Sequence, residues 1–379
     1  MNHVALLIPT IDRIGGAERQ VLLLARGLAR RGWKVTIVAL SGSGGTAARE
    51  ITSAGAGFVS LEMKRGLADP RGWIRFHRWL RQAQPDVVHA HLPHAAWLTR
   101  WSRLLAPVRV ALDTIHTSST GTRGRKMGYR RSHWLPDQVT AVSDSVANAY
   151  LTEHMVSKRT LTILPNGVDV NAWRPDPFLR KFFRRRLRLT NEFLWLAAGR
   201  LEPVKDYPAL LQAFSAIPPS AHLLIAGTGT LEAELRSLTE QLGLQNRVRL
   251  LGFQPDIRRW MQAADGFVLS SRWEGLPMGL LEASACALPV VATKVPGSWE
   301  IIVHGYSGLL SAAGDVSGLA AAMTRLMQTP FAERRTMGER AQQIVMERFD
   351  LEHILGRWET LYQSLLLRNQ SPARWARSS

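Results

Sequence analysis

The chain has 379 residues, which favours two domains over one, because single domains typically hold about 100–200 residues. Hydrophobic residues make up 46% of the chain and charged residues 21%, as in an ordinary globular protein with a large core. The formal net charge is +18, and residues 1–170 contribute +12 of it, with 23 Lys and Arg against 11 Asp and Glu. This charge favours an anionic partner but does not choose among nucleic acid, anionic lipid and a phosphorylated substrate.

The start of the chain has no basic leader and only a short apolar run at 4–9, so we expect no secretory signal. No uncharged apolar stretch approaches the ~20 residues that a membrane-spanning helix needs, and we expect a cytoplasmic protein. The single cysteine, Cys286, cannot form an internal disulfide. Its apolar neighbours predict a buried structural thiol and not a nucleophile.

Short aliphatic runs alternate with helical patterns in the first half of the chain. The runs lie at 4–8, 35–40, 86–90, 108–115, 139–142 and 161–164. This alternation predicts parallel βα units. After the first run, Val21, Leu24 and Leu28 form the apolar stripe of a helix that we expect to begin at Ala17 and end at Gly32.

The alternation is interrupted from 165 onward, where prolines and a basic run at 180–188 predict an interdomain linker. Further runs follow at 193–198, 222–226, 247–251, 266–270 and 288–293. The sequence therefore predicts an α/β protein of two doubly wound, Rossmann-like domains, 1–168 and 169–351. Helical patterns at 331–348 and 351–367 end the chain. We expect a C-terminal helix, about 352–370, to cross back to the first domain, and the residues after 370 to form a frayed tail.

Three turns after predicted strands carry candidate binding residues, because ligands of doubly wound folds bind beyond the carboxyl ends of the strands. The first turn, 9–18, has Gly15 and Gly16 at a helix start, where backbone amides can approach an anion closely. A plain tight turn would explain the same two glycines, and the turn lacks the dinucleotide GxGxxG pattern.

The second turn follows the run at 193–198 and contains Arg200 and Lys205. Two cations five residues apart could clamp a diphosphate, Arg200 as a planar fork and Lys205 as a point charge. A solvated surface loop is the alternative interpretation. Because this loop opens the second domain, we expect it to face the interdomain cleft.

The third turn, 270–283, places Glu274 in a loop and Glu282 inside the helix that follows. Pro277 suits the first turn of that helix, so the amides from Leu276 to Leu280 would form an anion site at the helix N-terminus. A carboxylate in an apolar helix is costly without a partner, which favours a ligand for Glu282. Two carboxylates beside a phosphate site suit a nucleotide-sugar.

On these residues the chain resembles the family 4 retaining glycosyltransferases of the GT-B fold. That family carries a Gly-Gly turn, an Arg…Lys loop and two glutamates separated by seven residues, which this sequence has at 15–16, at 200 and 205, and at 274 and 282. Similar segments at 165–169, 227–229, 252–253 and 295–302 extend the resemblance over nearly the whole chain. The C-terminal set is specific, whereas the N-terminal half is similar mainly in the Gly-Gly turn and in His116. The resemblance implies two Rossmann-like domains that face a cleft.

The resemblance also implies a role for each matching residue. Arg200 and Lys205 would hold the donor diphosphate, Glu274 would bind sugar hydroxyls, and Glu282 would bind the ribose. His116 would touch the donor sugar, and with Arg200, Lys205 and Glu274 it completes the predicted catalytic set. The predicted donor-binding residues besides Glu282 are Gly15, Gly16, Gly252, Phe253, Leu276, Pro277, Met278, Gly279 and Leu280.

The resemblance gives specific roles to the glycines and to Phe253, and an alternative exists for His116. Gly16 would let the diphosphate approach the backbone, while Gly252 and Phe253 would form part of the wall around the base. For His116 the alternative is a satisfied core histidine, since several other histidines lie nearby in the sequence: His89, His91 and His94.

The implied reaction moves a sugar from a UDP- or GDP-linked donor to a glycan or polyprenyl-linked acceptor, with retention of configuration, in surface polysaccharide or glycolipid synthesis. The departing diphosphate gains negative charge, so cations must lie at the leaving group. The sequence has no Asp-x-Asp, and we expect neither an essential metal nor a cofactor. A sugar-nucleotide epimerase of the same fold and a basic nucleic-acid-binding protein remain as alternatives.

Three segments of the basic half mix Arg with Trp, as interfacial segments do: 71–81, 97–103 and 122–134. We therefore expect peripheral binding to an anionic membrane surface, on the inner face of the cell membrane, and no nucleic-acid partner. For each segment the alternative is a helix whose Trp face is core and whose Arg face is merely solvated.

Overall fold

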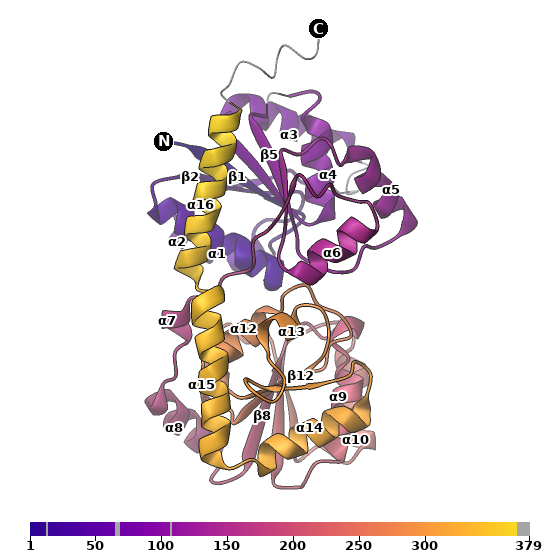
Figure 1. The fold of residues 1–379 in the computed structure, drawn as a ribbon, viewed down its shortest axis with the longest axis vertical. Helices are drawn as coiled ribbons and strands as arrows, with labels where there is room; N and C mark the ends of the chain where they lie inside the picture. The colour runs from indigo at the N-terminus through magenta and orange to yellow at the C-terminus, as the bar shows by residue number, and fades with distance from the viewer. Residues whose placement is uncertain (13, 65–68, 107, 370–379) are drawn as a thin grey trace. The chain divides into compact units, whose positions relative to one another are not determined.

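A computed structural model describes residues 1–12, 14–64, 69–106 and 108–369. The tail predicted after residue 370 lies outside these residues. The chain forms two compact units (Figure 1). The first comprises Met1–Gly167 and the segment from Leu351 onward, and the second comprises Val168–Asp350.

In the described part of the first unit, seven parallel strands form one sheet, in the order β3-β2-β1-β4-β5-β6-β7. In register, Val4 of β1 lies beside Val35 of β2 and Val87 of β4. The connections from β1 and from β4 run toward opposite edges, so the switch point lies between these two strands. The strands are β1 His3–Ile8, β2 Lys34–Ala39, β3 Gly57–Ser60, β4 Val87–His91, β5 Val110–Ile115, β6 Gln138–Ala141 and β7 Leu161–Ile163.

The helices of the first unit are α1 Gly16–Arg30, α2 Ala48–Ser53, α3 Pro70–Ala83, α4 Pro93–Ser102, α5 Arg123–Ser132, α6 Asp144–Thr152 and α16 Leu351–Arg368. The predicted stripe of α1 is buried, including Val21, Leu24 and Leu28. The helix begins one residue earlier than expected, at Gly16, because Gly15 serves as its N-cap. This confirms the first predicted βα unit.

The C-terminal helix α16 packs against α1 of the first unit, as predicted (Figure 1). Its buried side chains recur at helical spacing: Leu351, Ile354, Leu355, Trp358, Tyr362, Leu365 and Leu366. Burying one large apolar side chain contributes about 1.5–3 kcal/mol, so this stripe fixes the helix on the unit. At its edge Glu359 accepts hydrogen bonds from Arg31 and from the Trp33 indole, at 3.2 and 3.0 Å.

In the described residues of the second unit, six parallel strands have the order β10-β9-β8-β11-β12-β13. They are β8 Phe193–Ala198, β9 Ala221–Ala226, β10 Val248–Gly252, β11 Gly266–Leu269, β12 Val290–Thr293 and β13 Leu309–Ser311. The helices are α7 Val170–Trp173, α8 Pro177–Arg186, α9 Tyr207–Ser215, α10 Glu232–Gln241, α11 Arg258–Ala263, α12 Met278–Ala285, α13 Ser298–Ile301, α14 Val316–Gln328 and α15 Phe331–Arg348. Two parallel sheets covered by helices confirm the predicted α/β class.

The sequence analysis did not predict two of the strands, β3 and β13. Strand β3 opens on a glycine and is partly exposed, and β13 has three residues, so neither shows a long aliphatic run. Both are edge strands of their sheets. An edge strand is held by pairing with one neighbour, which short runs can provide without a strong sequence pattern.

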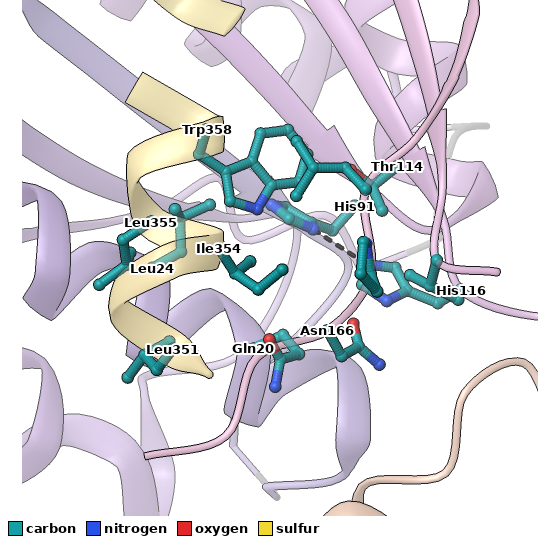
Figure 2. A pocket seen from close by; sticks show the side chains of 13 residues that line it. Gln20, Leu24, His91, Thr114, His116, Asn166, Leu351, Ile354, Leu355 and Trp358 are labelled. Atoms are coloured by element: carbon teal, nitrogen blue, oxygen red, sulfur yellow. Dashed lines mark hydrogen bonds between the residues drawn. The ribbon is translucent and has the colours of Figure 1, made fainter. Parts of the chain in front are cut away.

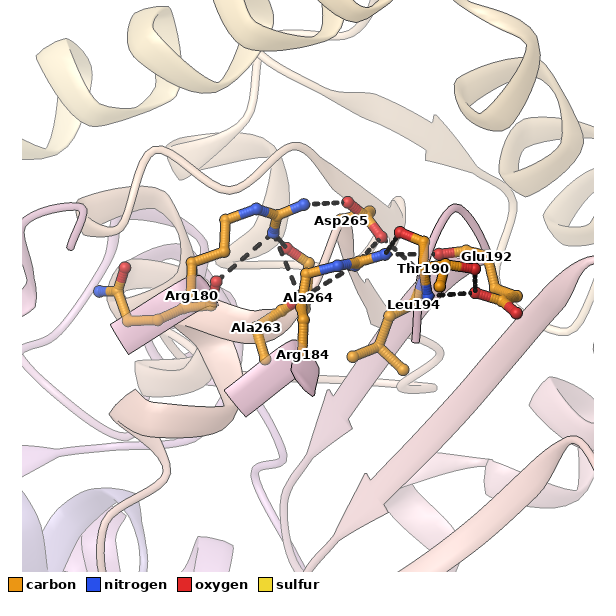
Figure 3. Close-up of polar contacts among 9 residues, drawn as sticks. Arg180, Arg184, Thr190, Glu192, Leu194, Ala263, Ala264 and Asp265 are labelled. Carbon is orange, nitrogen blue, oxygen red and sulfur yellow. Dashed lines mark hydrogen bonds and ion pairs between the residues drawn. The ribbon is translucent and has the colours of Figure 1, made fainter. Parts of the chain in front are cut away.

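The linker predicted from 165 onward, through the basic run at 180–188, is wrong over Pro177–Arg186, where the chain forms helix α8. Figure 3 shows the reason: Arg180 and Arg184, one helical turn apart, both pair with Asp265. Their guanidinium groups also donate to the carbonyls of Ala263 and other residues at the end of α11. Asp265 in turn accepts from the Leu194 amide at 2.9 Å, so the basic run holds α8 against the start of β8.

Candidate functional site

The central strands β8 and β11 of the second unit lie side by side, and their connections lead to opposite edges of the sheet. The loops beyond their carboxyl ends therefore form the switch point, where doubly wound folds bind ligands. Lys205 ends a short 3₁₀ helix after β8, and Glu274 lies in the loop after β11. The Lys205 Nζ lies 2.5 Å from Glu274 Oε1, and the two side chains are 17% and 12% exposed. The structure thus brings two of the predicted catalytic residues into direct contact.

Hydroxyl groups of neighbouring residues hold this ion pair in place through hydrogen bonds. Ser271 donates to Glu274 Oε1 at 2.6 Å, and Ser270 donates to the Lys205 carbonyl at 2.7 Å. Thr293, the last residue of β12, donates to the Ser271 carbonyl at 2.6 Å. The sequence analysis assigned no role to these three residues, although two serines directly after a buried strand were a visible signal.

A second ion pair joins the same two loops. Arg272 Nε lies 2.9 Å from Asp206 Oδ2, and the hydrogen bond with this carboxylate raises the Arg272 pKa. The Arg272 amide also donates to the Val204 carbonyl at 2.8 Å. Asp206 is buried and has a φ of +49°, a left-handed conformation that Asp tolerates better than most residues. The positions of Lys205 and Glu274 are therefore set by contacts on both sides of each residue.

A glycine fixes the loop in front of α12. Gly297, after β12, has a φ of +82°, and a Cβ placed there would lie 2.3 Å from the Gly275 carbonyl oxygen. No side chain fits between these two backbones. The loop that carries Glu274 consequently packs directly on the 295–298 turn, which Ser298 braces by donating to the Thr293 carbonyl at 2.6 Å.

The loop with Arg200 is also held by close backbone packing, here against the loop that follows β9. A Cβ at Gly227 would lie 1.9 Å from the Gly199 carbonyl oxygen, so the loops after β8 and β9 touch through their backbones. The Leu201 amide donates to the Thr228 carbonyl at 2.9 Å. Arg200 itself is exposed and pairs with no carboxylate among the residues that the structure describes. It is available to an anionic ligand.

Helix α12 places the remaining predicted residues of the third turn. Pro277 is its N-cap, one position before the first turn predicted for it. Around this helix start are the predicted donor-binding residues Leu276, Pro277, Met278, Gly279 and Leu280. Glu282 is half-buried in the helix, and Cys286 at its end is buried. Burial, with the nearby Glu282 carboxylate, raises the Cys286 pKa, as suits the predicted structural thiol.

The predicted wall residues lie two strands away. Gly252 ends β10 with a φ of +67°, and its carbonyl accepts from the Gly227 amide at 2.8 Å. Phe253 follows with half of its surface exposed. An exposed aromatic ring on this edge of the sheet could stack on a base.

The first unit holds the other candidates. Gly15 and Gly16 lie where β1 passes into α1, at the amino end of a 15-residue helix. Gly15 has a φ of −107°, so left-handed backbone is not the reason for glycine there. His116 follows β5 and lines a cavity with residues of α1 and α16 (Figure 2). Burial lowers the pKa of His116 to about 4, so its ring is neutral near pH 7.

His116 is hydrogen-bonded to a residue for which the sequence analysis predicted no role. The Nδ1 of His91, the last residue of β4, lies 3.0 Å from the His116 Nε2 (Figure 2). His89 is separately satisfied, since its two ring nitrogens bond Tyr362 and Thr114 at 2.6 and 2.7 Å. The core-histidine interpretation therefore describes His89 and not His116, which has one buried ring nitrogen without a partner among the described residues.

The three segments that mix Arg with Trp differ in structure. In α3, Trp73 and Trp79 pack on the core, which follows the alternative interpretation for 71–81. On α4, on α5 and in the turns after each helix, hereafter the surface between α4 and α5, large apolar side chains are exposed: Trp101, Leu104, Leu105, Met127 and Trp134. Arg123 and Arg131 beside them are exposed and form no ion pair within the described residues. This second surface combines apolar and cationic groups.

Among the described residues no helix is both long enough and apolar enough to span a bilayer. Over the same residues, no group of three or more His, Cys, Asp or Glu side chains is arranged to hold a metal ion. The groups that the described site offers are two cations, the amides at the start of α12 and two carboxylates.

Two family models match the chain. Residues 14–172 match the model described as Glycosyltransferase Family 4, and residues 180–344 match the one described as Glycosyl transferases group 1. The chain is 28% identical over 301 residues to the N-acetyl-alpha-D-glucosaminyl L-malate synthase of Bacillus anthracis, covering 74% of this chain and 75% of that enzyme. It is 26% identical over 277 residues to the UDP-Gal:alpha-D-GlcNAc-diphosphoundecaprenol alpha-1,3-galactosyltransferase of Escherichia coli, covering 69% and 71%.

A solved structure is similar in fold. The Anabaena protein HepE in complex with UDP-glucose superposes with a TM-score of 0.86 at 23% identity, covering 95% of this chain and 99% of that one. This likeness confirms the predicted GT-B architecture of two Rossmann-like domains.

Proposed function

We propose that this chain, which belongs to the family 4 glycosyltransferases, moves a sugar from a UDP-linked donor to a lipid-linked glycan with retention of configuration. The observation that carries the proposal is the contact of Lys205 with Glu274 at the switch point, beside the exposed Arg200 and the start of α12. This arrangement suits a ligand with both a diphosphate and hydroxyl groups.

In the proposed reaction the bond between the sugar and the diphosphate breaks, and negative charge develops on the diphosphate. Cations already in place stabilise that charge without reorganisation. Arg200 can form a planar fork on the phosphate oxygens, and Lys205 acts as a point charge. The amides at the start of α12 add a partial positive charge. The pairing with Glu274 positions Lys205 for this role before the donor arrives.

The carboxylates serve the neutral parts of the donor. Glu274 is held by Ser271 and Lys205 with its carboxylate at the rim of the sheet, where it can accept from sugar hydroxyls. Glu282 lies eight residues further along, in α12, and is assigned to the ribose. Phe253 and Gly252 are assigned to the base. No metal or cofactor is included, because Arg200 and Lys205 can supply the charge that a metal would otherwise provide.

The choice of donor and acceptor rests on relatives. HepE was solved with UDP-glucose, and the Escherichia coli relative is named for UDP-Gal and a diphosphoundecaprenol-linked sugar. We extend this chemistry to the present chain, with surface polysaccharide or glycolipid as the product. We also propose that the enzyme acts on the inner face of the cell membrane.

The surface between α4 and α5 supports a membrane contact. Exposed Trp134 and Met127 lie next to the cations Arg123 and Arg131, which is the composition of an interfacial segment. The buried face of helix α5 is held by Arg100. This residue hydrogen-bonds Asp113 and Ser132 and lies over the Tyr129 ring. The outer side chains are therefore presented on a rigid support.

A thermal-shift screen of UDP-, GDP- and ADP-sugars tests the donor, because a ligand at 100 times its Kd stabilises the protein by about 2.7 kcal/mol. We expect stabilisation by a UDP-sugar. Transfer is then measured with that donor and a polyprenyl-diphosphate-linked acceptor, and the anomeric configuration of the product is read by NMR. Conversion of the donor alone, without acceptor, would indicate the epimerase. Absence of stabilisation by any nucleotide-sugar would contradict the proposal.

A further inference from the structure

A small cavity in the first unit is lined by polar side chains from several elements. They include Gln20 of α1, His91 of β4, Thr114 of β5, His116 and Asn166 (Figure 2). The volume in which the centre of a water molecule fits is about 20 Å³, which suits one water molecule or one hydroxyl group. The cavity is too small for a sugar ring, so what it can take is a single polar group.

The two histidines that line this cavity each have one ring nitrogen without a hydrogen-bond partner among the described residues. His91 Nδ1 and His116 Nε2 bond each other, whereas His91 Nε2 and His116 Nδ1 are buried with no hydrogen-bond partner among the described residues. Buried polar atoms in folded proteins are nearly always hydrogen-bonded. These two outer nitrogens are therefore open to a partner from outside the described residues, such as water or substrate.

The shared hydrogen bond links the protonation of the two outer nitrogens. A neutral imidazole carries one proton, and the inner bond has room for one. If His91 Nδ1 donates, His116 must carry its proton on Nδ1, and His91 Nε2 is an acceptor. If His116 Nε2 donates, His116 Nδ1 is the acceptor and His91 Nε2 carries the proton. In either case the pair presents one donor and one acceptor.

We propose that His91 is the positioning residue for His116: the shared hydrogen bond orients the His116 ring and ties its tautomer to that of His91, so that His116 Nδ1 is kept for a substrate hydroxyl. This inference rests on the proposed contact of His116 with the donor sugar. A hydroxyl both donates and accepts, so it can bond His116 Nδ1 in either arrangement of the protons. A phosphate or carboxylate only accepts, and can bond His116 Nδ1 only when that atom carries the proton.

The surroundings keep His91 in place. It ends β4 in register with Thr114 of β5, and its ring packs on that of His89 with centroids 4.0 Å apart. His89 is anchored by Tyr362 of α16 and by Thr114. Desolvation lowers the pKa of His91 well below its ordinary value and that of His116 to about 4, so near pH 7 both rings remain neutral, as the proton count requires.

Four variants test the inference. His116→Ala tests the proposed function itself. His91→Leu removes the bonding atom, and His91→Asn returns a group near the Nδ1 position that can donate or accept. His222→Leu, a partly exposed histidine on β9, is the matched control. The measurements are kcat, the KM for the UDP-sugar, and the ring ¹⁵N shifts of His116, which distinguish the two neutral tautomers.

We expect a neutral His116 in the wild type and a change in its ring ¹⁵N shifts in His91→Leu, where Nε2 loses its partner. The kcat of His91→Leu should fall by roughly ten- to a hundredfold, as it does when the partner that orients a functional histidine is lost. His91→Asn should recover most of that loss, and His222→Leu should match the wild type.

The outcomes separate the two hypotheses. Wild-type turnover in His116→Ala would reject the role of His116. Loss of turnover in His116→Ala with wild-type turnover in His91→Leu would reject the positioning role alone. If His91→Leu does not fold, the wild-type spectrum still decides, because a protonated His116 near pH 7 would overturn the inference.

Discussion

The ammonium of Lys205 lies 2.5 Å from a carboxylate oxygen of Glu274, and this ion pair joins the loops that follow the two central strands of the second sheet. The two residues are 69 positions apart in sequence. Each is mostly buried and further held by a serine hydroxyl. A cation that is fixed in this way needs no rearrangement when charge develops beside it.

Replacing Lys205 by Ala should slow transfer by about a hundred- to a thousandfold, because one preorganised contact with the departing diphosphate is lost. Steady-state kinetics with the UDP-sugar measure the loss. Lys158→Ala removes an exposed lysine of the first unit and serves as the control. Equal turnover in both variants would remove Lys205 from the catalytic set.

Replacing Glu282 by Ala should weaken donor binding while turnover at saturation stays near that of the wild type. Contacts with the ribose form equally in the ground state and in the transition state, and their loss mainly raises KM. Calorimetry with UDP gives the affinity directly. The control is Glu234→Ala, an exposed glutamate in α10. A fall in kcat with unchanged KM would contradict the ribose assignment.

Gly297→Ala should reduce both stability and donor affinity. The added Cβ would meet the Gly275 carbonyl at 2.3 Å and displace the loop that carries Glu274. Gly305 is the control, with a similar φ of +76°. Apart from its chain neighbours, no atom of the described residues lies within 4 Å of a Cβ added there. Gly305→Ala therefore tests backbone strain without the clash. We expect Gly297→Ala to be less stable than Gly305→Ala by about 1–3 kcal/mol, the usual cost of overpacking. Similar melting temperatures and UDP affinities for the two variants would argue against the tight packing.

The protein should lose stability as the pH falls from about 6.5 toward 4. The folded pKa of His116 is lowered from 6.5 to about 4, so in this window the unfolded chain binds a proton that the folded ring does not. Above pH 6.5 both states are neutral at this site and the effect is absent. Melting temperatures at pH 7.5 and 5.5 should differ less in His116→Asn than in the wild type. An identical difference in the two proteins would show that His116 does not titrate in this way.

Sedimentation with anionic liposomes tests the surface between α4 and α5. The wild type should sediment at low salt and less at high salt, because exposed charges are screened. Arg131→Ser combined with Trp134→Ser should reduce binding. The matched control removes another exposed pair, Phe331 and Arg335 of α15, by the same substitutions. Equal recovery in the supernatant with and without liposomes would reject the membrane contact.

Local patterns determined much of the fold. Aliphatic runs bounded by turns located most strands of both sheets, and the helical pattern at 351–367 predicted the helix that packs on the first unit. These features are readable because burial of one face imposes a period on the chain. Edge strands β3 and β13 lack that signal, since they are short and pair with one neighbour each.

The sequence by itself also determined which residue types stand in the loops after two strands, Arg200, Lys205 and Glu274, and in the helix after the second loop, Glu282. What only the tertiary structure decided is which of them meet. Lys205 pairs with Glu274, His116 pairs with His91, and the basic run at 180–188, predicted to be a linker, forms a helix held by Asp265. These contacts join residues 25 to 85 positions apart. Charge and hydrogen bonding act over distances in space, and a chain sets those distances only when its strands have taken their order in a sheet.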